Sequence, residues 1–212
     1  GDVPSARTMA ATMTTDEVRD LAVRRGGVMR GLGIDVDLAP VVDVSDQADR
    51  TVIGDRSWSD DPATVVAYAG AYAEGLLDAG VAPVLKHFPG HGQASGDTHE
   101  VSASTPPLAD LRDRDLVPYA ELLPRLGTRA GVMLGHLDVP GLTEDGLPTS
   151  LSPATVALLR GEYGFDGVVM TDDMSGMRSV TDRFGLGESA VRAVAAGVDV
   201  VLFVGSGVGP II

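Results

Sequence analysis

The chain has 212 residues, of which 44% are hydrophobic and 22% are charged, a composition typical of folded globular proteins rather than disordered or collagen-like chains. Its 30 acidic residues outnumber its 16 basic residues, and the charge of -14 opposes binding to nucleic acid or to an anionic membrane surface. The absence of Cys excludes thiolate catalysis, disulfides and Cys-ligated zinc, and no apolar run approaches the roughly 18 residues of a membrane span.

Helical and strand patterns alternate along the chain. Thr14 and Glu17 form a capping box at the first predicted helix, and Asp61 followed by Pro62 is a typical helix start. The predicted elements are a helix over 14–33, a strand region over 34–43, a helix over 61–80, a strand over 81–85, a long loop to about 107, a helix over 112–126, a strand over 130–137, a helix over 152–163, a strand over 167–171, a helix over 187–197 and a strand over 198–204. Because no linker divides this series, we expect a single domain over residues 1–212.

Short, almost wholly apolar strands that alternate with helices predict a parallel sheet of the α/β class. Such a sheet is either open and doubly wound or closed as a (β/α)8 barrel of the TIM type. Polar residues follow four of the predicted strands, and in a barrel all strand ends surround one pocket, which favours the barrel; these residues are Asp43, Lys86, His87, His136, Asp172 and Asp173. Only five strands are recognisable, so we expect an incomplete barrel whose N-terminal strand lies upstream of this chain.

The segment 86–92, Lys-His-Phe-Pro-Gly-His-Gly, concentrates chemically active side chains. Lys86 is the only lysine of the chain, and a compact ammonium can donate to several sugar hydroxyls, although a chance lysine is the simpler explanation. A metal site is the alternative interpretation of the nearby histidines. Pro89 and Gly90 prevent the helix that would align His87 with His91, so we expect neither a metal nor a cofactor.

Two pairs of residues could carry acid–base or nucleophilic chemistry. Asp97 and His99 form an Asp-x-His pair, in which the carboxylate would orient the imidazole as a general acid and base. Asp172 and Asp173 follow the strand over 167–171, and adjacent side chains of an extended segment point in opposite directions. Only one of the two carboxylates can therefore face the barrel axis, unless both merely cap the helix that follows.

Three blocks of the sequence resemble the β-N-acetylglucosaminidases of glycoside hydrolase family 3. They are Val-Ile-Gly-Asp-Arg-Ser-Trp over 52–58, the segment 86–92 with Asp97-Thr98-His99, and Gly-Phe-Asp-Gly over 164–167 leading into Thr-Asp-Asp-Met over 171–174. The resemblance implies a retaining mechanism with Asp172 as the nucleophile and His99 as the acid/base, oriented by Asp97. It implies sugar binding by Arg56, Lys86 and His87, with His136 at the same pocket. The acidic residue followed by Gly-Gly-Arg that the family presents on an earlier strand does not occur here.

The function that this resemblance implies is the release of terminal GlcNAc from peptidoglycan-derived muropeptides or chito-oligosaccharides, with phosphate as a second conceivable acceptor beside water. A metal-dependent barrel hydrolase and a non-catalytic sugar-binding barrel are the alternatives. The partner is a small carbohydrate, and we expect a monomer with no nucleic-acid partner and no membrane-spanning segment. The Arg-rich, nearly Lys-free composition is typical of high-GC bacteria, and we expect a location in the cell envelope or outside the cell, with the cytoplasm as the alternative.

Overall fold

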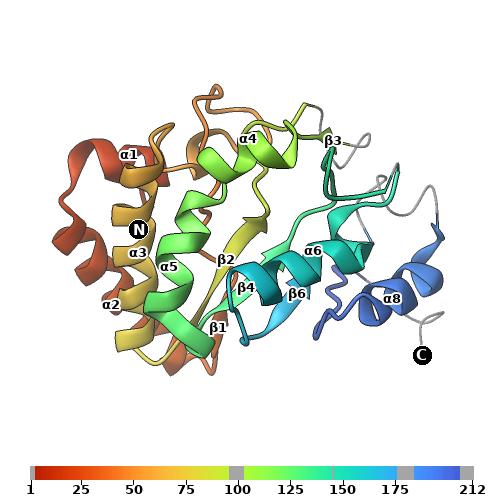
Figure 1. Cartoon of the computed structure of the whole chain (residues 1–212). Helices are drawn as coiled ribbons and strands as arrows, with labels where there is room; N and C mark the ends of the chain where they lie inside the picture. The colour runs from red at the N-terminus through yellow and green to blue at the C-terminus, as the bar shows by residue number, and fades with distance from the viewer. Residues whose placement is uncertain (1–2, 96–102, 145, 176–183, 206–212) are drawn as a thin grey trace.

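A computed structural model describes residues 3–95, 103–144, 146–175 and 184–205 (Figure 1). Its α-helices are α1 (Ala6–Thr12), α2 (Thr15–Gly31), α3 (Pro62–Asp78), α4 (Leu108–Asp113), α5 (Val117–Leu126), α6 (Pro153–Ala157) and α8 (Leu186–Ala195). Short 3-10 helices cover Gly54–Arg56, Thr149–Leu151 and Gly127–Arg129, and a π-helical turn over Leu158–Glu162 continues α6. The strands are β1 (Val36–Asp37), β2 (Ala82–Phe88), β3 (Ala103–Ser104), β4 (Gly131–Leu134), β5 (Leu137–Asp138) and β6 (Val169–Thr171).

The main sheet is parallel throughout, and its strand order is β1-β2-β4-β6. Each strand is therefore added to the sheet on the same side as the strand before it. A bridge from Met170 to Val200 continues the series in the same direction. A doubly wound sheet reverses its order at a switch point, whereas a barrel wall does not. The helices α3, α5, α6 and α8 follow one another along the sheet in the same order (Figure 1). The predicted α/β class and barrel-type parallel wall are confirmed.

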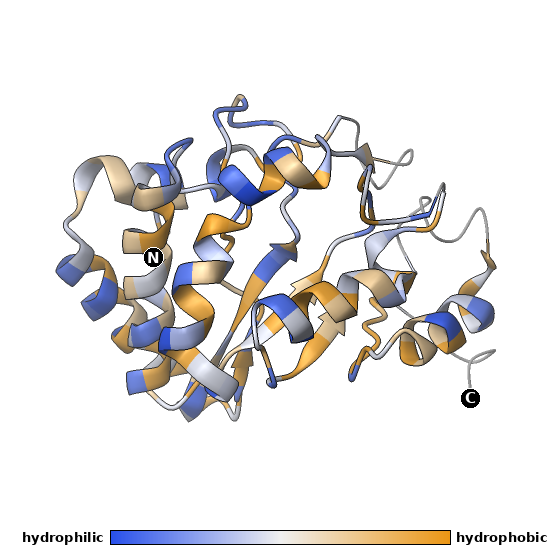
Figure 2. Ribbon diagram, viewed as in Figure 1, coloured by the Kyte–Doolittle hydropathy of each residue, from blue (hydrophilic) through white to orange (hydrophobic). Residues whose placement is uncertain are grey.

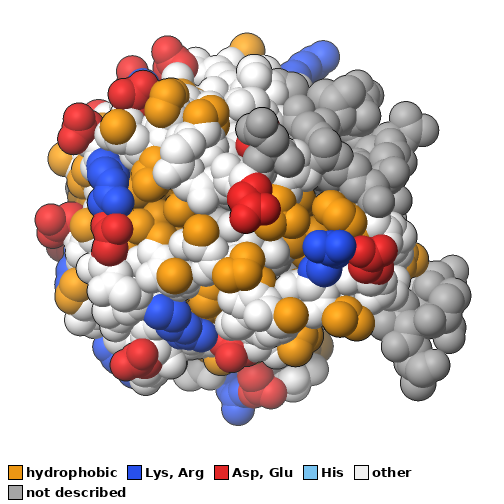
Figure 3. Space-filling model, turned by 45° about the vertical axis from the view of Figure 1, so that its right-hand side comes forward, with side chains coloured by type: hydrophobic (Ala, Val, Ile, Leu, Met, Phe, Trp, Pro, Cys, Tyr) orange, Lys and Arg blue, Asp and Glu red, His pale blue; other side chains and the backbone are white. Residues whose placement is uncertain are grey.

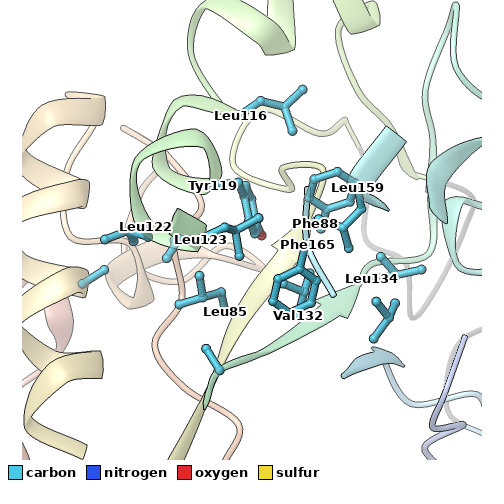
Figure 4. Packing of buried hydrophobic residues seen from close by; sticks show 14 of the residues in the cluster. Leu85, Phe88, Leu116, Tyr119, Leu122, Leu123, Val132, Leu134, Leu159 and Phe165 are labelled. Atoms are coloured by element: carbon cyan, nitrogen blue, oxygen red, sulfur yellow. The ribbon is translucent and has the colours of Figure 1, made fainter. Parts of the chain in front are cut away.

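The two faces of this sheet carry different sets of apolar side chains. The outer face packs against the helices, and Figure 4 shows the centre of this layer, with residues of α5 over β2 and β4; the labelled side chains include Leu85, Phe88, Tyr119, Leu122, Leu123, Val132 and Leu134. The inner face holds a separate cluster of Val84, Met133 and Met170, flanked by Leu38 and Leu202. Val84, Met133 and Met170 come from β2, β4 and β6, as is expected of side chains that fill a barrel.

Hydropathy follows this layering in Figure 2, where the strands are mainly hydrophobic and the helices present hydrophilic residues on their outer sides. Figure 3 shows another face, on which acidic and basic side chains are interspersed among apolar ones. None of the helices in the described part of the chain is both long enough and apolar enough to cross a membrane.

Several predicted elements differ from the observed ones. The single helix predicted over 112–126 is wrong, because α4 ends at Asp113 and α5 starts at Val117, with Pro118 in its first turn. The strand predicted over 198–204 is reduced to the bridge at Val200 and to single hydrogen bonds with β6. Helix α1 was not predicted, although Ser5 caps it by accepting a hydrogen bond from the backbone N–H of Thr8.

Candidate active site

The carboxyl end of β2 carries two residues of the site, Lys86 and His87. The strand is irregular at this point. Lys86 pairs with Met133 and Phe88 pairs with Leu134, so His87 is an extra residue on the β2 side of the ladder. A bulge of this kind redirects side chains at the rim of a sheet. Here it allows two consecutive residues to serve the same site, since both Lys86 and His87 interact electrostatically with Asp172.

Asp43 lies beneath this bulge, and its side chain is fully buried. Its carboxylate accepts hydrogen bonds from the His87 backbone N–H, from His87 Nδ1 at 2.7 Å and from the His91 backbone N–H at 2.7 Å. Burial alone would raise the pKa of Asp43, but the adjacent His87 and the hydrogen bonds from His87 and His91 hold it below its ordinary value. Asp43 is therefore an ionised carboxylate at neutral pH.

Asp172 approaches His87 from the end of β6. Its Oδ2 lies 3.7 Å from His87 Nε2, and its backbone N–H donates to the carbonyl of Leu134 at the end of β4. Burial raises the pKa of the Asp172 carboxyl, but His87, His136, the Asp173 backbone N–H and Lys86 lower it, and the outcome is a pKa below the ordinary value. The carboxylate is thus ionised and partly exposed at the rim of the sheet, the state that a nucleophile requires.

Asp173 has a different task from its neighbour, as the alternation of an extended chain predicts. Its Oδ1 accepts hydrogen bonds from the backbone N–H and hydroxyl of Ser175 and from the backbone N–H of Val204. It thereby joins the loop after β6 to the segment that follows α8. The interpretation that both carboxylates only cap a helix does not describe Asp172, whose Oδ2 faces His87.

Lys86 supplies positive charge near Asp172, and Arg56 adds positive charge near Lys86. Burial is the main cause that lowers the pKa of Lys86, opposed chiefly by the negative charge of Asp172. Arg56, at the end of the 3-10 helix Gly54–Arg56, is exposed and lines a hollow of about 400 Å³ together with Lys86, Trp58 and Tyr72. Lys86 and Arg56 therefore both line this hollow.

His136 is held by contacts within the protein. It is buried, its Nε2 donates to the backbone carbonyl of Asp173 at 3.1 Å, and its Nδ1 lies 2.6 Å from the hydroxyl of Ser150. Burial lowers the pKa of the His136 ring, which favours its neutral form. Both ring nitrogens have partners within the protein, and the contact of His136 with substrate stays a prediction. The ring instead fastens the end of β4 to the backbone beside Asp172.

Three buried residues behind the site were not among the predicted site residues. Asp115 Oδ1, His91 Nε2 and the Tyr119 hydroxyl each lack a hydrogen-bond partner within the described part of the chain. Burial, with the nearby charge of Asp43, raises the pKa of Asp115 to about 7. His91 carried a signal in its motif, whereas Asp115 and Tyr119 belong to a segment that reads as an ordinary amphipathic helix.

The predicted acid/base pair, Asp97 and His99, lies outside the described residues. Within the described residues, no group of three or more His, Asp or Glu side chains is arranged to hold a metal ion. The described residues place an ionised carboxylate, Asp172, beside the imidazole of His87 and the ammonium of Lys86 at the carboxyl end of a parallel sheet. This arrangement is suited to covalent catalysis on a polyhydroxylated substrate.

Comparison with known protein families supports this interpretation of the site. Residues 1–210 match the model of the glycosyl hydrolase family 3 N terminal domain. The chain belongs to glycosyl hydrolase family 3. This finding confirms the family resemblance that the three sequence blocks indicate.

Relatives within the family are similar over nearly the whole chain. Beta-hexosaminidase LpqI of Mycobacterium tuberculosis is 58% identical over 209 residues, which are 96% of this chain and 53% of that protein. A solved family 3 glycosyl hydrolase from Mycobacterium smegmatis superposes with a TM-score of 0.95 at 54% identity, over 99% of this chain and 64% of that one. A family 3 β-N-acetylglucosaminidase from Paenibacillus has a TM-score of 0.89 at 35% identity, over 95% of this chain and 38% of its own. The chain spans about half the length of the curated relatives it matches.

Proposed function

We propose that the protein containing this chain is a retaining exo-β-N-acetylglucosaminidase, which releases terminal GlcNAc through a covalent glycosyl-enzyme intermediate. The observation that carries the proposal is the ionised Asp172 carboxylate, 3.7 Å from His87 Nε2 and within the field of Lys86. Relatives named beta-hexosaminidase, 58% and 38% identical to this chain, support the activity and the amino-sugar substrate.

In the first step of the proposed reaction, an oxygen of Asp172 attacks the anomeric carbon while the bond from that carbon to the aglycone oxygen breaks. His99, oriented by Asp97, gives the departing oxygen a proton. In the second step His99 removes a proton from water, the water oxygen bonds to the anomeric carbon, and Asp172 leaves as a carboxylate. A carboxylate that is already ionised at neutral pH needs no base to activate it.

Lys86, His87 and Arg56 are proposed to bind the hydroxyls of the terminal sugar. Lys86 offers three donors on a flexible chain, and His87 offers Nε2 on the side of Asp172. Because Lys86 and His87 lie beside the nucleophile, they hold the anomeric carbon within its reach, and such positioning contributes a large part of enzymatic rate acceleration.

The first prediction concerns which aspartate becomes glycosylated. After incubation of the full-length protein with a 5-fluoro N-acetylglucosaminyl fluoride, intact-mass analysis should show one added sugar, mapped by peptide fragmentation to Asp172. Asp172→Asn should show no adduct, because an amide is not a nucleophile for this step.

Asp173→Asn is the matched control for this experiment. It removes the adjacent carboxylate, which holds Ser175 and Val204, so it should lower stability yet still acquire the sugar at Asp172. An adduct at Asp173, or turnover by Asp172→Asn equal to that of the native protein, contradicts the assignment. Binding of GlcNAc with neither adduct nor turnover would instead identify a sugar-binding barrel.

Muropeptides from peptidoglycan are the proposed natural substrates, and the cell envelope is the proposed location. The composition typical of high-GC bacteria supports both proposals, as does the similarity to a mycobacterial beta-hexosaminidase. Comparison of kcat/KM for a muropeptide and for chitobiose tests the substrate, and fractionation of cells followed by immunoblotting tests the location.

A further inference from the structure

We propose that Asp43 is a positioning residue that keeps the proton of the neutral His87 ring on Nδ1 and thereby directs Nε2 toward the substrate site. The placement of the proton concerns this chain alone. Its effect on turnover rests on the proposed function.

The contacts of Asp43 leave the Nδ1 atom of His87 one protonation state. The Asp43 carboxylate is ionised, and an ionised carboxylate accepts hydrogen bonds but cannot donate one. Since Asp43 Oδ2 lies 2.7 Å from His87 Nδ1, that nitrogen must carry a proton. The ring of His87 is 4% exposed, so water does not compete effectively for Nδ1. In the neutral ring the lone pair therefore belongs to Nε2.

The same carboxylate also fixes where the ring lies. Asp43 accepts from the backbone N–H of His87 and from that of His91, so it joins both ends of the turn that carries the ring. A further hydrogen bond, from the backbone N–H of Gly90 to the carbonyl of His87, closes the turn. Asp43 therefore determines both the position of the His87 ring and the ring nitrogen that carries the proton.

Charged and titratable neighbours favour the hydrogen bond between Asp43 and His87. Asp115 is a second buried carboxyl, and burial with the nearby charge of Asp43 raises its pKa to about 7, so it is largely uncharged at about pH 6 and largely ionised at about pH 9. Burial, together with Asp43 and Asp115, also raises the pKa of Tyr119 well above its ordinary value, so this residue stays neutral. Burial lowers the pKa of His91. At about pH 6, Asp43 is thus the principal charge behind the His87 ring.

On the side of the site, Nε2 stands 3.7 Å from Asp172 Oδ2, which exceeds hydrogen-bond distance. Nε2 is therefore available to a third group, and in the neutral ring it accepts a hydrogen bond. A sugar hydroxyl is the donor that the proposed function supplies. With the other tautomer, Nε2 would carry a hydrogen and could not accept from that hydroxyl.

The experiment compares His87 in the full-length protein and in Asp43→Asn by long-range ¹H–¹⁵N correlation NMR, which distinguishes the two tautomers. At about pH 9, where an imidazole ordinarily carries one proton, the native protein should show the proton on Nδ1. Asparagine offers one acceptor oxygen in place of two. If that oxygen accepts from the backbone N–H groups, the amide N–H group faces Nδ1 of His87. If the oxygen faces Nδ1 instead, a backbone donor is left unpaired. The Asp43→Asn spectrum should then show the proton on Nε2, or a mixture of tautomers.

Turnover provides the second readout, at about pH 6. Asp43→Asn should lower kcat/KM by roughly 10²–10⁴-fold, as expected when a buried carboxylate no longer fixes a tautomer, and should change the pH profile of the reaction. Asp115→Asn is the matched control, because it neutralises a buried carboxyl next to Asp43 that has no contact with the His87 ring. It should leave the tautomer of His87 unchanged.

The outcomes separate this proposal from the proposed function. A native spectrum with the proton on Nε2 overturns the proposal even if Asp43→Asn fails to fold, and so does a folded Asp43→Asn protein with an unchanged tautomer. The tautomer results hold whether or not the protein releases GlcNAc, so an inactive native protein with the proton on Nδ1 would count against the proposed function alone.

Discussion

Two carboxyl groups are buried behind the site, and the protein shifts their pKa values in opposite directions. Asp43 receives hydrogen bonds from His87 and His91, and its pKa falls. Asp115 is 2% exposed, its Oδ1 has no partner in the described ranges, and its pKa rises to about 7. The charge of His87 and the hydrogen bonds from His87 and His91, rather than depth, make this difference, because both side chains are removed from water.

The raised pKa of Asp115 has a cost in stability that depends on pH. Between about pH 4 and pH 7 the unfolded chain loses this proton while the folded protein keeps it, so the free energy of unfolding falls as the pH rises. Asp115→Asn removes the effect. Because the pKa moves from 3.8 to about 7, the variant should gain up to ~4 kcal/mol relative to the native protein between about pH 4 and pH 8. Urea unfolding at several pH values measures this difference, and parallel pH curves for the two proteins would contradict it.

The sequence indicates which residues reach the site better than it indicates what each one does there. Lys86, His87 and Asp172 could be predicted because polar residues at the ends of apolar strands are conspicuous. His136 stands in the same position of its strand, yet it binds Ser150 and the Asp173 backbone. The distinction depends on partners 14 and 37 residues away in the chain, and no local pattern encodes them. Asp115 gave no signal because its carboxyl is buried only by tertiary packing.

At the scale of elements, α2 and α3 approach each other through small residues. A Cβ atom added at Gly75 would lie 2.5 Å from the backbone oxygen of Arg19 and 2.8 Å from Ala22 Cβ. One added at Gly26 would lie 2.5 Å from Ala79 Cβ. These glycines lower helix propensity, but they allow the two backbones to pack closely beside the sheet.

Gly75→Ala tests this close packing. Alanine improves helix propensity by about 1 kcal/mol, but here its methyl group collides with the Arg19 carbonyl, and overpacking typically costs 1–3 kcal/mol. We expect a net loss of up to about 2 kcal/mol in the free energy of unfolding. Gly27→Ala is the control, because this exposed glycine of α2 has no atom within 4 Å of an added Cβ, and it should stabilise by about 0.5–1 kcal/mol. Equal effects of the two changes would show that the contact does not limit stability.

Local signals predicted the starts of the helices more accurately than their continuity. Thr14 and Glu17 form the predicted capping box, and Asp61 caps α3 by accepting from the backbone N–H of Thr64. Such caps depend on four consecutive residues, so the sequence is sufficient to recognise them. The division between α4 and α5 is different, because Pro118 lacks the backbone N–H that a continuous helix over 108–126 would use at that position. Pro118 instead suits the first turn of a new helix, a local signal that the prediction of a single helix overlooked.

At the scale of the whole molecule, the site exists only when several strand ends are in register. Val42 donates its backbone N–H to the carbonyl of Lys86, Asp172 donates to Leu134, and the His136 ring reaches Asp173. These bonds connect β2, β4 and β6 with the segment after β1 at the carboxyl edge of the sheet. A ligand that contacts Lys86 and Asp172 spans the central strand β4, so its binding energy should resist unfolding of the sheet as a whole.

The last prediction follows from this connection and uses GlcNAc as the probe. At about 100 times its dissociation constant, GlcNAc should raise the free energy of unfolding by ~2.7 kcal/mol, the value expected when a ligand binds only the folded state. Amide hydrogen exchange should slow in β2, β4 and β6 together, because binding favours the assembled sheet over any state in which one strand has opened. Lys86→Gln should keep the fold and lose most of this effect, since the ammonium that is proposed to hold the sugar is gone while the stem of the side chain remains. Protection confined to a single loop, or an equal gain in Lys86→Gln, would mean that the sugar binds elsewhere than across these strand ends.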